Sequence, residues 1–302
     1  MNESEGGIMK HRLGPLVKTA LCLGGALAYY YYQNYCLQST HYILESPVYP
    51  SQMEGLKIVH LSDLNLPEQK VPFSQLIRKV KKECPGMIAL TGNLIHQELA
   101  FNPQELKAFA SELVAIAPTF MVYGDHEVQS TYSRLMEECL QASGVKMLHD
   151  QAITWNYQGD SITIMGLMEK VNRHFLKRDP LKFIRLSKEQ EALPKILLAH
   201  HPEAFLRYHD QDEKSPDLVL TGHAQGGQIQ VPGIGGLYAP NQGYFPSYTE
   251  GVYRLPGNRY KGMVISRGIG QPQWEFRLHN RSEMVCVTLV KDWQAFKSRY
   301  MK

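Results

Sequence analysis

The sequence has few cysteines, and their spacing excludes two classes of small stabilised domain. Among 302 residues there are only five cysteines, an odd number with irregular spacing and no Cys-x-x-Cys pair. Zinc-binding motifs and disulfide frameworks both need regularly spaced cysteines. Neither is therefore predicted, and the thiols are expected to be buried or free.

The sequence also lacks a strong excess of positive charge. Its formal net charge is +3 and its pI is about 8.4, with no long run of basic residues. Nucleic-acid-binding proteins carry basic patches that neutralise phosphates, so no nucleic-acid partner is expected. Hydrophobic residues make up 43% of the chain and charged residues 20%. That composition is typical of a packed core and not of a disordered chain.

An apolar run near the N-terminus predicts a membrane helix. Residues 19–32 carry no charge, and extending the run back to residue 13 gives 20 residues with Lys18 near one end. This length matches a bilayer, and the Lys18 ammonium could reach the headgroups. Four successive tyrosines suit the opposite interface, and basic residues before the run predict an N-terminus that stays inside. The main domain is therefore expected to be membrane-anchored and extracytoplasmic.

Two other interpretations of this run stay open. Residues 26–28 (Ala-Leu-Ala) fit a signal-peptidase site, so the segment could be a cleaved signal peptide. It could also be an ordinary helix of a soluble protein. With a membrane helix, the chain divides into a cytoplasmic tip and anchor (1–37), one main domain (38–291) and a C-terminal tail (292–302). No repeat or low-complexity linker divides the central part.

Strand-like and helical segments alternate along the main domain. Apolar runs predict strands at 56–61, 87–91, 119–123, 195–199 and 217–221, and a hairpin at 152–166. Helical spacing of apolar residues predicts helices at 73–84, at 132–140, after Asn102-Pro103 and near Pro202. The C-terminal part is rich in glycine and strand-forming residues. This order predicts an α/β sandwich with mixed β-sheets.

Polar clusters follow directly after five of these strands. They are SDLNL (62–66), TGNLIH (91–96), YGDHE (123–127), AHHPE (199–203) and TGHAQGGQ (221–228). Open α/β sheets place their sites at the carboxyl ends of strands. Ordinary turns after strands also favour Gly, Asp and Asn, but turn chemistry does not explain the histidines. The five clusters are therefore expected to form one site.

With these clusters in this order, the sequence resembles the calcineurin-like metallophosphoesterases, in particular a membrane-tethered bacterial branch. The motifs of that family are D-x-H, G-D, G-N-H-[ED], H and G-H-x-H, and residues 236–253 and 266–270 also look like this branch. The resemblance covers about residues 38–290. It implies a four-layer sandwich of two mixed β-sheets flanked by helices. It also implies hydrolysis of phosphoric esters with two divalent ions, of Mn, Fe, Zn or Co.

The resemblance carries over to the individual residues unevenly. Four metal positions of the family keep a strong ligand in this sequence: Asp63, Asp125, His200 and His223. Asp125 stands where the family has an asparagine. His126 matches the histidine that protonates the leaving alkoxide, and Glu127 follows it; both are assigned to catalysis. His201, next to His200, is expected to point away from the metal, and His96 is expected in a surface loop.

Three family ligands are replaced by neutral amides. Asn65 and Gln225 stand where the family has histidines, and Asn93 stands where it has the aspartate that bridges both ions. All three losses fall on one metal position, while the other keeps two histidines and a carboxylate. Since amides bind these metals more weakly than imidazole or carboxylate, one divalent ion is favoured over two.

Two functions therefore stay open. One is a metal-dependent phosphoric ester hydrolase with a weakened metal site, and the other is an inactive relative that binds a phosphate-bearing ligand or a protein partner. A site held near the membrane would suit a lipid or cell-envelope precursor as phosphoester substrate.

Overall fold

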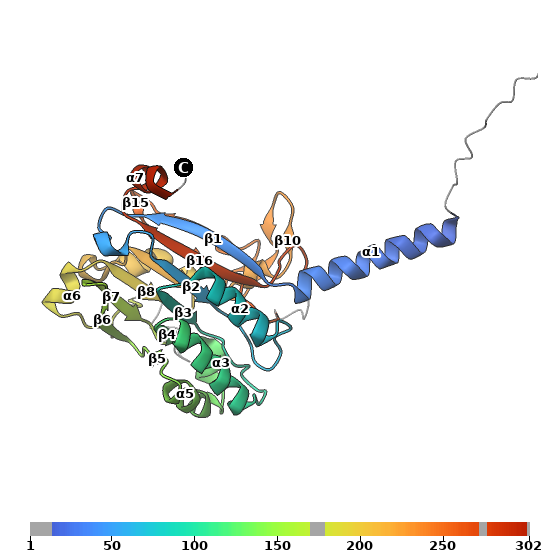
Figure 1. Cartoon of the computed structure of the whole chain (residues 1–302), viewed down its shortest axis with the longest axis horizontal. Coiled ribbons are helices and arrows are strands. Elements are labelled where there is room, and N and C mark those ends of the chain that lie inside the picture. Colours follow the sequence, from blue (N-terminus) through green and yellow to red (C-terminus); the bar gives the residue numbers. More distant parts are fainter. Residues whose placement is uncertain (1–13, 170–178, 272–276, 301–302) are drawn as a thin grey trace, which may run out of the picture.

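The computed structural model describes residues 14–169, 179–271 and 277–300, and two six-stranded mixed β-sheets form its centre (Figure 1). The first sheet has the order β1 (Gln38–Glu45), β16 (Glu283–Val290), β2 (Lys57–Leu61), β3 (Met87–Thr91), β4 (Thr119–Val122), β5 (Lys146–Met147). The second has the order β14 (Gly251–Leu255), β15 (Asn258–Ile265), β9 (Leu218–Thr221), β8 (Lys195–Leu198), β7 (Asp160–Gly166), β6 (Gln151–Tyr157). The predicted mixed sheets, the strands and the hairpin of β6 and β7 are confirmed.

One hydrophobic core lies between the two sheets. Successive residues of a strand point to opposite faces, so Ile58 packs in this inner core and Val59 packs on the outer face of the same sheet. Strands β2, β3 and β4 are parallel neighbours, as are β7, β8, β9 and β15. The carboxyl ends of parallel strands meet at one edge of each sheet. This arrangement brings the polar clusters together.

Three helices cover the outer face of the first sheet, as predicted. They are α2 (Phe73–Glu83), α3 (Pro103–Ile116) and α5 (Ser133–Ala142), and they bury their apolar faces with the outer side of that sheet. The start of α3 follows the predicted pattern. The Asn102 side chain accepts hydrogen bonds from the backbone N–H groups of Gln104 and Glu105, and Pro103 is the first helical residue.

We expect Asn102→Ala to lower the free energy of unfolding by about 1 kcal/mol, because two backbone N–H groups at the start of α3 would lose their acceptor. Urea denaturation followed by circular dichroism measures this change. Asn102→Asp keeps an acceptor at the same place and serves as the control, with no more than a few tenths of that loss.

The outer face of the second sheet has a different cover. A 3₁₀ helix, η2 (Pro202–His209), packs there with residues 181–186, and Phe205 and Tyr208 are buried against Leu197 and Val219. The helix predicted near Pro202 is therefore present, and it is of the 3₁₀ type. Shorter elements complete the chain: α4 (Asp125–Gln129), α6 (Lys188–Ala192), η1 (Ser51–Met53), η3 (Asp212–Lys214), η4 (Gln225–Gly227), β10 (Gln230–Val231), β11 (Gly235–Gly236), β12 (Tyr238–Ala239), β13 (Gly243–Tyr244).

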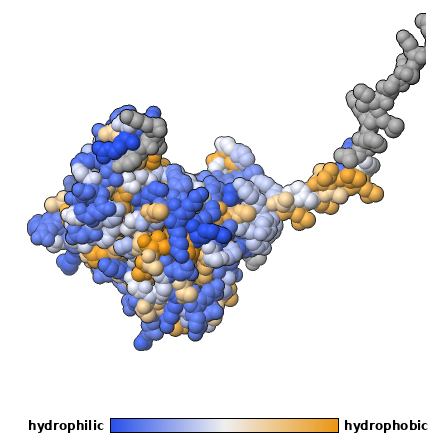
Figure 2. Space-filling view, viewed as in Figure 1, coloured by the Kyte–Doolittle hydropathy of each residue, from blue (hydrophilic) through white to orange (hydrophobic). Residues whose placement is uncertain are grey.

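The N-terminal helix α1 (Pro15–Tyr35) projects away from the sandwich and exposes hydrophobic side chains (Figures 1 and 2). Within residues 14–169, 179–271 and 277–300, however, no helix combines the length and the apolar character needed to cross a membrane. The predicted membrane helix is therefore not borne out. The physical reason lies in its composition, because Lys18, the tyrosines, Gln33 and Asn34 lower the mean hydropathy of a helix that is long enough.

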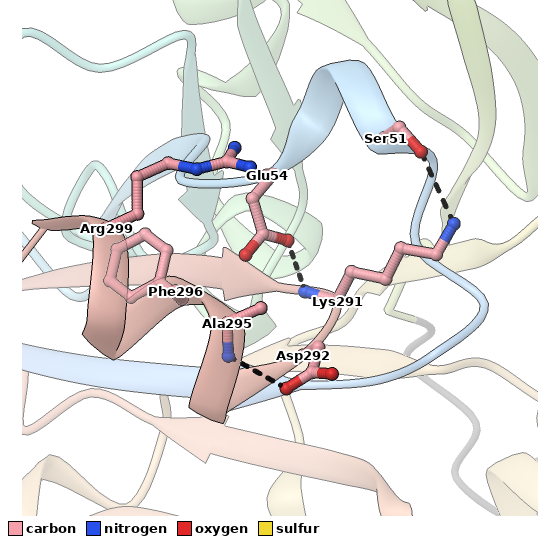
Figure 3. Close-up of a pocket in the computed structure, with 7 residues that line it drawn as sticks. All are labelled: Ser51, Glu54, Lys291, Asp292, Ala295, Phe296 and Arg299. Atoms are coloured by element: carbon pink, nitrogen blue, oxygen red, sulfur yellow. Dashed lines mark hydrogen bonds between the residues drawn. The ribbon is translucent and has the colours of Figure 1, made fainter.

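The C-terminal helix α7 (Trp293–Tyr300) lies within the predicted tail. It borders a surface pocket of about 210 Å³ with the turn at η1 (Figure 3). The Glu54 carboxylate accepts a hydrogen bond from the Lys291 backbone, and Asp292 accepts one from the backbone of Ala295. This pocket contains no residue of the five polar clusters. The domain boundaries themselves stay a prediction.

Candidate metal centre

The five polar clusters meet at the carboxyl ends of β2, β3, β4, β8 and β9. Asp63 lies directly beside residues of three other clusters: its carboxylate contacts the Asn93 amide and the His223 backbone, and His200 Nε2 is 3.9 Å away. Asp125 contacts His223. The five clusters therefore lie close together, as expected from their positions after the strands.

Two glycines allow the loops after β3 and β4 to touch. A Cβ atom on Gly92 would lie 2.4 Å from the backbone nitrogen of Gly124, and one on Gly124 would lie 2.5 Å from Oδ1 of Asn93. Asp63, Asn93 and His223 also have positive φ angles of 52°, 52° and 65°. Such backbone costs about 1–3 kcal/mol per residue and occurs where surrounding contacts hold it, often at functional sites.

The protein itself satisfies the Asp63 carboxylate. Oδ2 accepts hydrogen bonds from Ser62 Oγ at 2.7 Å and from the His223 backbone at 3.0 Å, and Oδ1 accepts one from Asn93 Nδ2 at 3.2 Å. Asn93 in turn accepts a hydrogen bond from the His126 backbone through Oδ1. An amide can donate to one neighbour and accept from the other, whereas an aspartate at this position would face the Asp63 carboxylate.

The other two amides point to different partners. Asn65 Nδ2 donates to the backbone carbonyl of Gln271, and its Oδ1 is buried without a hydrogen bond. Gln225 is buried at the start of η4, where its backbone carbonyl, not its side chain, accepts a hydrogen bond from the Asn280 side chain. Among the described residues, neither side chain hydrogen-bonds to Asp63 or Asn93.

Asp125, His200 and His223 form a compact group, which we call the central site. Their nearest ligand atoms all lie within 4.8 Å of one another, and His223 Nδ1 is 3.1 Å from Asp125 Oδ2. His200 is fully buried, and its Nδ1 lies 2.7 Å from the carbonyl of Thr91. Donation to that carbonyl leaves Nε2 with its lone pair, and Nε2 has no hydrogen-bond partner. This is the usual arrangement of a metal-binding histidine.

Three further residues, His201, Glu169 and Glu203, extend this group. None of them was among the site residues predicted from the sequence. His201 does not point away from the group: Nε2 is 3.1 Å from Asp125 Oδ1 and 3.4 Å from Glu169 Oε2, and Nδ1 is 2.9 Å from Glu203 Oε1. The expectation for His201 is therefore wrong. Glu169 follows β7, which is parallel to β8. Its position after the carboxyl end of a strand could therefore have predicted that it lies at this edge of the sheet.

Charges in this region shift the ionisation of its members. Burial alone would lower the pKa of His201, but Glu169 and the hydrogen bonds to Asp125 and Glu203 raise it well above its usual value. Burial and the neighbouring His201 lower the pKa of His223 to about 4. Burial raises the pKa of Glu169. The carboxylates around His201 thus favour its protonated form, whereas burial and the neighbouring His201 disfavour that form of His223.

His126 and Glu127 differ in their surroundings, although both were assigned to catalysis. His126 Nδ1 is buried without a hydrogen bond, and its ring contacts the His96 ring at a centroid distance of 5.4 Å. His96 therefore borders the site. The Glu127 carboxylate is fully buried and accepts four backbone hydrogen bonds, from residues 93, 94, 95 and 124.

Comparison with known proteins agrees with this arrangement. The family model for calcineurin-like phosphoesterases matches residues 56–225. The uncharacterized metallophosphoesterase YkuE of Bacillus subtilis is 26% identical over 93% of this chain and 96% of its own length. The phosphodiesterase YaeI of Escherichia coli is 26% identical over 78% and 82%, respectively.

The matched segment contains the ends of β4, β8 and β9, which carry the three residues of the central site. It also contains the buried histidine and carboxylate groups whose ligand atoms converge there. Members of this family use divalent metals, and the ligand types at the central site suit such an ion. The chain belongs to the calcineurin-like phosphoesterase family.

Proposed function

We propose that the protein is a metal-dependent phosphoric ester hydrolase that holds a divalent ion at the central site, between Asp125, His200 and His223. The observation that carries the proposal is His200 Nε2, which is buried without a hydrogen-bond partner while Nδ1 is fixed by Thr91. Leaving such a nitrogen unpaired costs about 1–3 kcal/mol, and an ion would offset that cost. Two imidazoles and one carboxylate suit Zn, Fe, Co or Mn with positions left for substrate.

The residues around the ion have distinct roles in this proposal. When bound, the ion supplies Lewis acidity towards a phosphoryl oxygen and a water molecule. Asn241 contacts His223 Nε2 at 2.8 Å, which leaves Nδ1 facing the site. Asp63 and Asn93 hold the loops after β2 and β3 in register through their mutual hydrogen bond. Because these two side chains already satisfy each other, the second position of the family arrangement is the weaker one.

His126 is the proposed proton donor to the leaving alkoxide. Its backbone nitrogen donates a hydrogen bond to Asn93 Oδ1, which fixes the start of α4, and its Nδ1 makes no hydrogen bond within the described part of the chain. A ring held in place with one unengaged nitrogen is suited to proton transfer with a substrate. Glu127 is proposed to act indirectly, because its carboxylate is occupied by backbone N–H groups.

We expect His126→Ala to reduce hydrolysis of an aryl phosphodiester by about 10²–10⁴-fold in the presence of Mn²⁺, because proton transfer to the leaving group is lost. A phosphodiester is the first substrate to use, since the relative from Escherichia coli is named a phosphodiesterase. Steady-state rates are measured at equal metal content. His41→Ala changes an exposed histidine in β1 and is the matched control, with an unchanged rate.

An inactive, ligand-binding protein is the second candidate, favoured by one observation. The bridging carboxylate of the family is replaced by Asn93, which is hydrogen-bonded on both sides to protein atoms. The same assay separates the candidates. A wild-type rate equal to that of His126→Ala, together with binding of inorganic phosphate by both, would support the inactive protein and contradict the hydrolase.

A further inference from the structure

A second group of ligands lies beside the central site and is formed by Asp125, Glu169 and His201. Their nearest ligand atoms also lie within 4.8 Å of one another. We call this group the lateral site. Two of its members, Glu169 and His201, do not occupy ligand positions of the family's motifs. The three amides at family ligand positions do not contribute to the lateral site either.

Glu169 is the unusual member of the lateral site. Its side chain is 1% exposed, and neither carboxylate oxygen has a hydrogen-bond partner among the described residues. In the part of the chain that the structure describes, its ion-pair contact is with His201, at 3.4 Å. Glu203 also pairs with His201, and its Oε2 is buried without a hydrogen bond. One imidazole therefore faces more carboxylate charge than it can neutralise, and a buried uncompensated carboxylate is costly.

The distances in the lateral site fit metal coordination. For metal–ligand bonds of about 2.0–2.2 Å, adjacent ligand atoms lie about 3.0–3.5 Å apart. His201 Nε2 is 3.1 Å from Asp125 Oδ1 and 3.4 Å from Glu169 Oε2. These two distances match adjacent positions of a coordination shell, and the three residues each offer a ligand atom within 4.8 Å of the others.

Glu203 occupies the opposite side of the His201 ring. Its Oε1 lies 2.9 Å from His201 Nδ1, so a proton on Nδ1 would be donated to Glu203 and Nε2 would be left for an ion. A carboxylate that orients a histidine in this way is the usual partner of a ligating imidazole. Glu203 would thus position His201 without binding the ion itself.

Asp125 connects the two sites through its two oxygens. Oδ2 faces His223 in the central site, and Oδ1 faces His201 in the lateral site. A carboxylate that offers one oxygen to each of two ions reduces their mutual repulsion, which is the role lost at Asn93. The bridging charge has therefore moved from the loop after β3 to the loop after β4.

From these observations we infer that the protein binds a second divalent ion at the lateral site, with Asp125 bridging it to the ion of the central site. Two carboxylates and one imidazole form a harder ligand set than the two imidazoles of the central site, so Mn²⁺ is better suited to the lateral site than Zn²⁺. The inference extends the proposed function, because the central ion belongs to that proposal and the lateral ion does not.

The test counts ions in the full chain. The protein is stripped of metal, equilibrated with Mn²⁺, and measured by elemental analysis and electron paramagnetic resonance. The wild type is expected to bind two Mn²⁺ with a spin-coupled signal, since the two ions share a carboxylate. Glu169→Gln is expected to bind one, with the uncoupled six-line signal. Circular dichroism checks folding, and His201→Asn is a second variant with the same expected loss.

Glu203→Gln is the matched control, because it removes an equal charge from beside His201 but leaves an oxygen for His201 Nδ1. It is expected to keep two ions at saturating Mn²⁺, with an affinity at the lateral site about 10–100-fold weaker. One ion in both the wild type and Glu169→Gln would overturn the lateral site and leave the proposed function intact. Two ions in both would place the second ion elsewhere and overturn it as well. No ion in the wild type would overturn both.

Discussion

Glu127→Gln is expected to lower the free energy of unfolding by about 3–5 kcal/mol, although the substitution changes a single atom of the side chain. Oε2 accepts hydrogen bonds from the backbone of Asn93 at 2.7 Å and of Gly124 at 2.8 Å, and Oε1 accepts those of Leu94 and Ile95. A glutamine would turn an NH₂ group towards two N–H donors. Buried donors without an acceptor cost about 1–3 kcal/mol each, and more beside a lost charge.

Chemical denaturation measures this loss, and thermal unfolding should shift by about 10 °C for a domain of this size. Glu138→Gln, on the exposed side of α5, removes the same charge without removing buried hydrogen bonds and is the control. A loss below about 1 kcal/mol for Glu127→Gln would contradict the structural role. That outcome would instead support a catalytic role for Glu127.

The orientation of Glu127 could not be read from its neighbours in the sequence. The cluster YGDHE predicts polar chemistry after β4, and that location is correct. A side chain there can face either the central site or the neighbouring backbone. Which of the two it faces depends on how the loops after β3 and β4 pack together. The close approach of Gly92 and Gly124 decides this, and it involves residues far apart in the chain.

The strands and the central site could be predicted for a physical reason. Buried parallel strands are near-continuous apolar runs, and polar residues at their carboxyl ends must meet at one edge. Glu169 follows the same rule, since it comes after β7. It was missed because the hairpin of β6 and β7 suggested an antiparallel region, whereas β7 pairs with β8 in parallel on its other side.

The helical elements show which features neighbouring residues in the sequence can predict and which depend on tertiary packing. Asn102-Pro103 begins a helix as predicted because capping needs only adjacent residues. A helix also begins at Pro202 as predicted, but its 3₁₀ type was not specified by the sequence prediction. Tertiary packing of Phe205 and Tyr208 determines that outcome. His201 turns into the site for a related reason, because Glu203 and Asp125 both attract it.

Asp125→Asn is expected to remove both ions, and this is the largest functional effect that the structure implies. Asp125 is the one carboxylate in the central site and one of the two in the lateral site. Losing a charged ligand should weaken binding by about 4 kcal/mol, or on the order of 10³-fold, at each position. Isothermal titration with Mn²⁺ measures the affinity. Circular dichroism should be unchanged, because an amide oxygen can still accept from one of the two histidines.

The companion variants Asn93→Asp and Asn93→Asp/Asp125→Asn test whether the bridging charge has moved. In the single variant the new carboxylate lies beside Asp63, where Nδ2 and Oδ1 are now 3.2 Å apart. Two adjacent carboxylates repel each other unless a cation lies between them, so this variant should be less stable without metal and regain stability with Mn²⁺. The double variant should recover one bound ion near Asp63. Retention of both ions by Asp125→Asn alone would instead mean that the charge after β4 does not hold the metals.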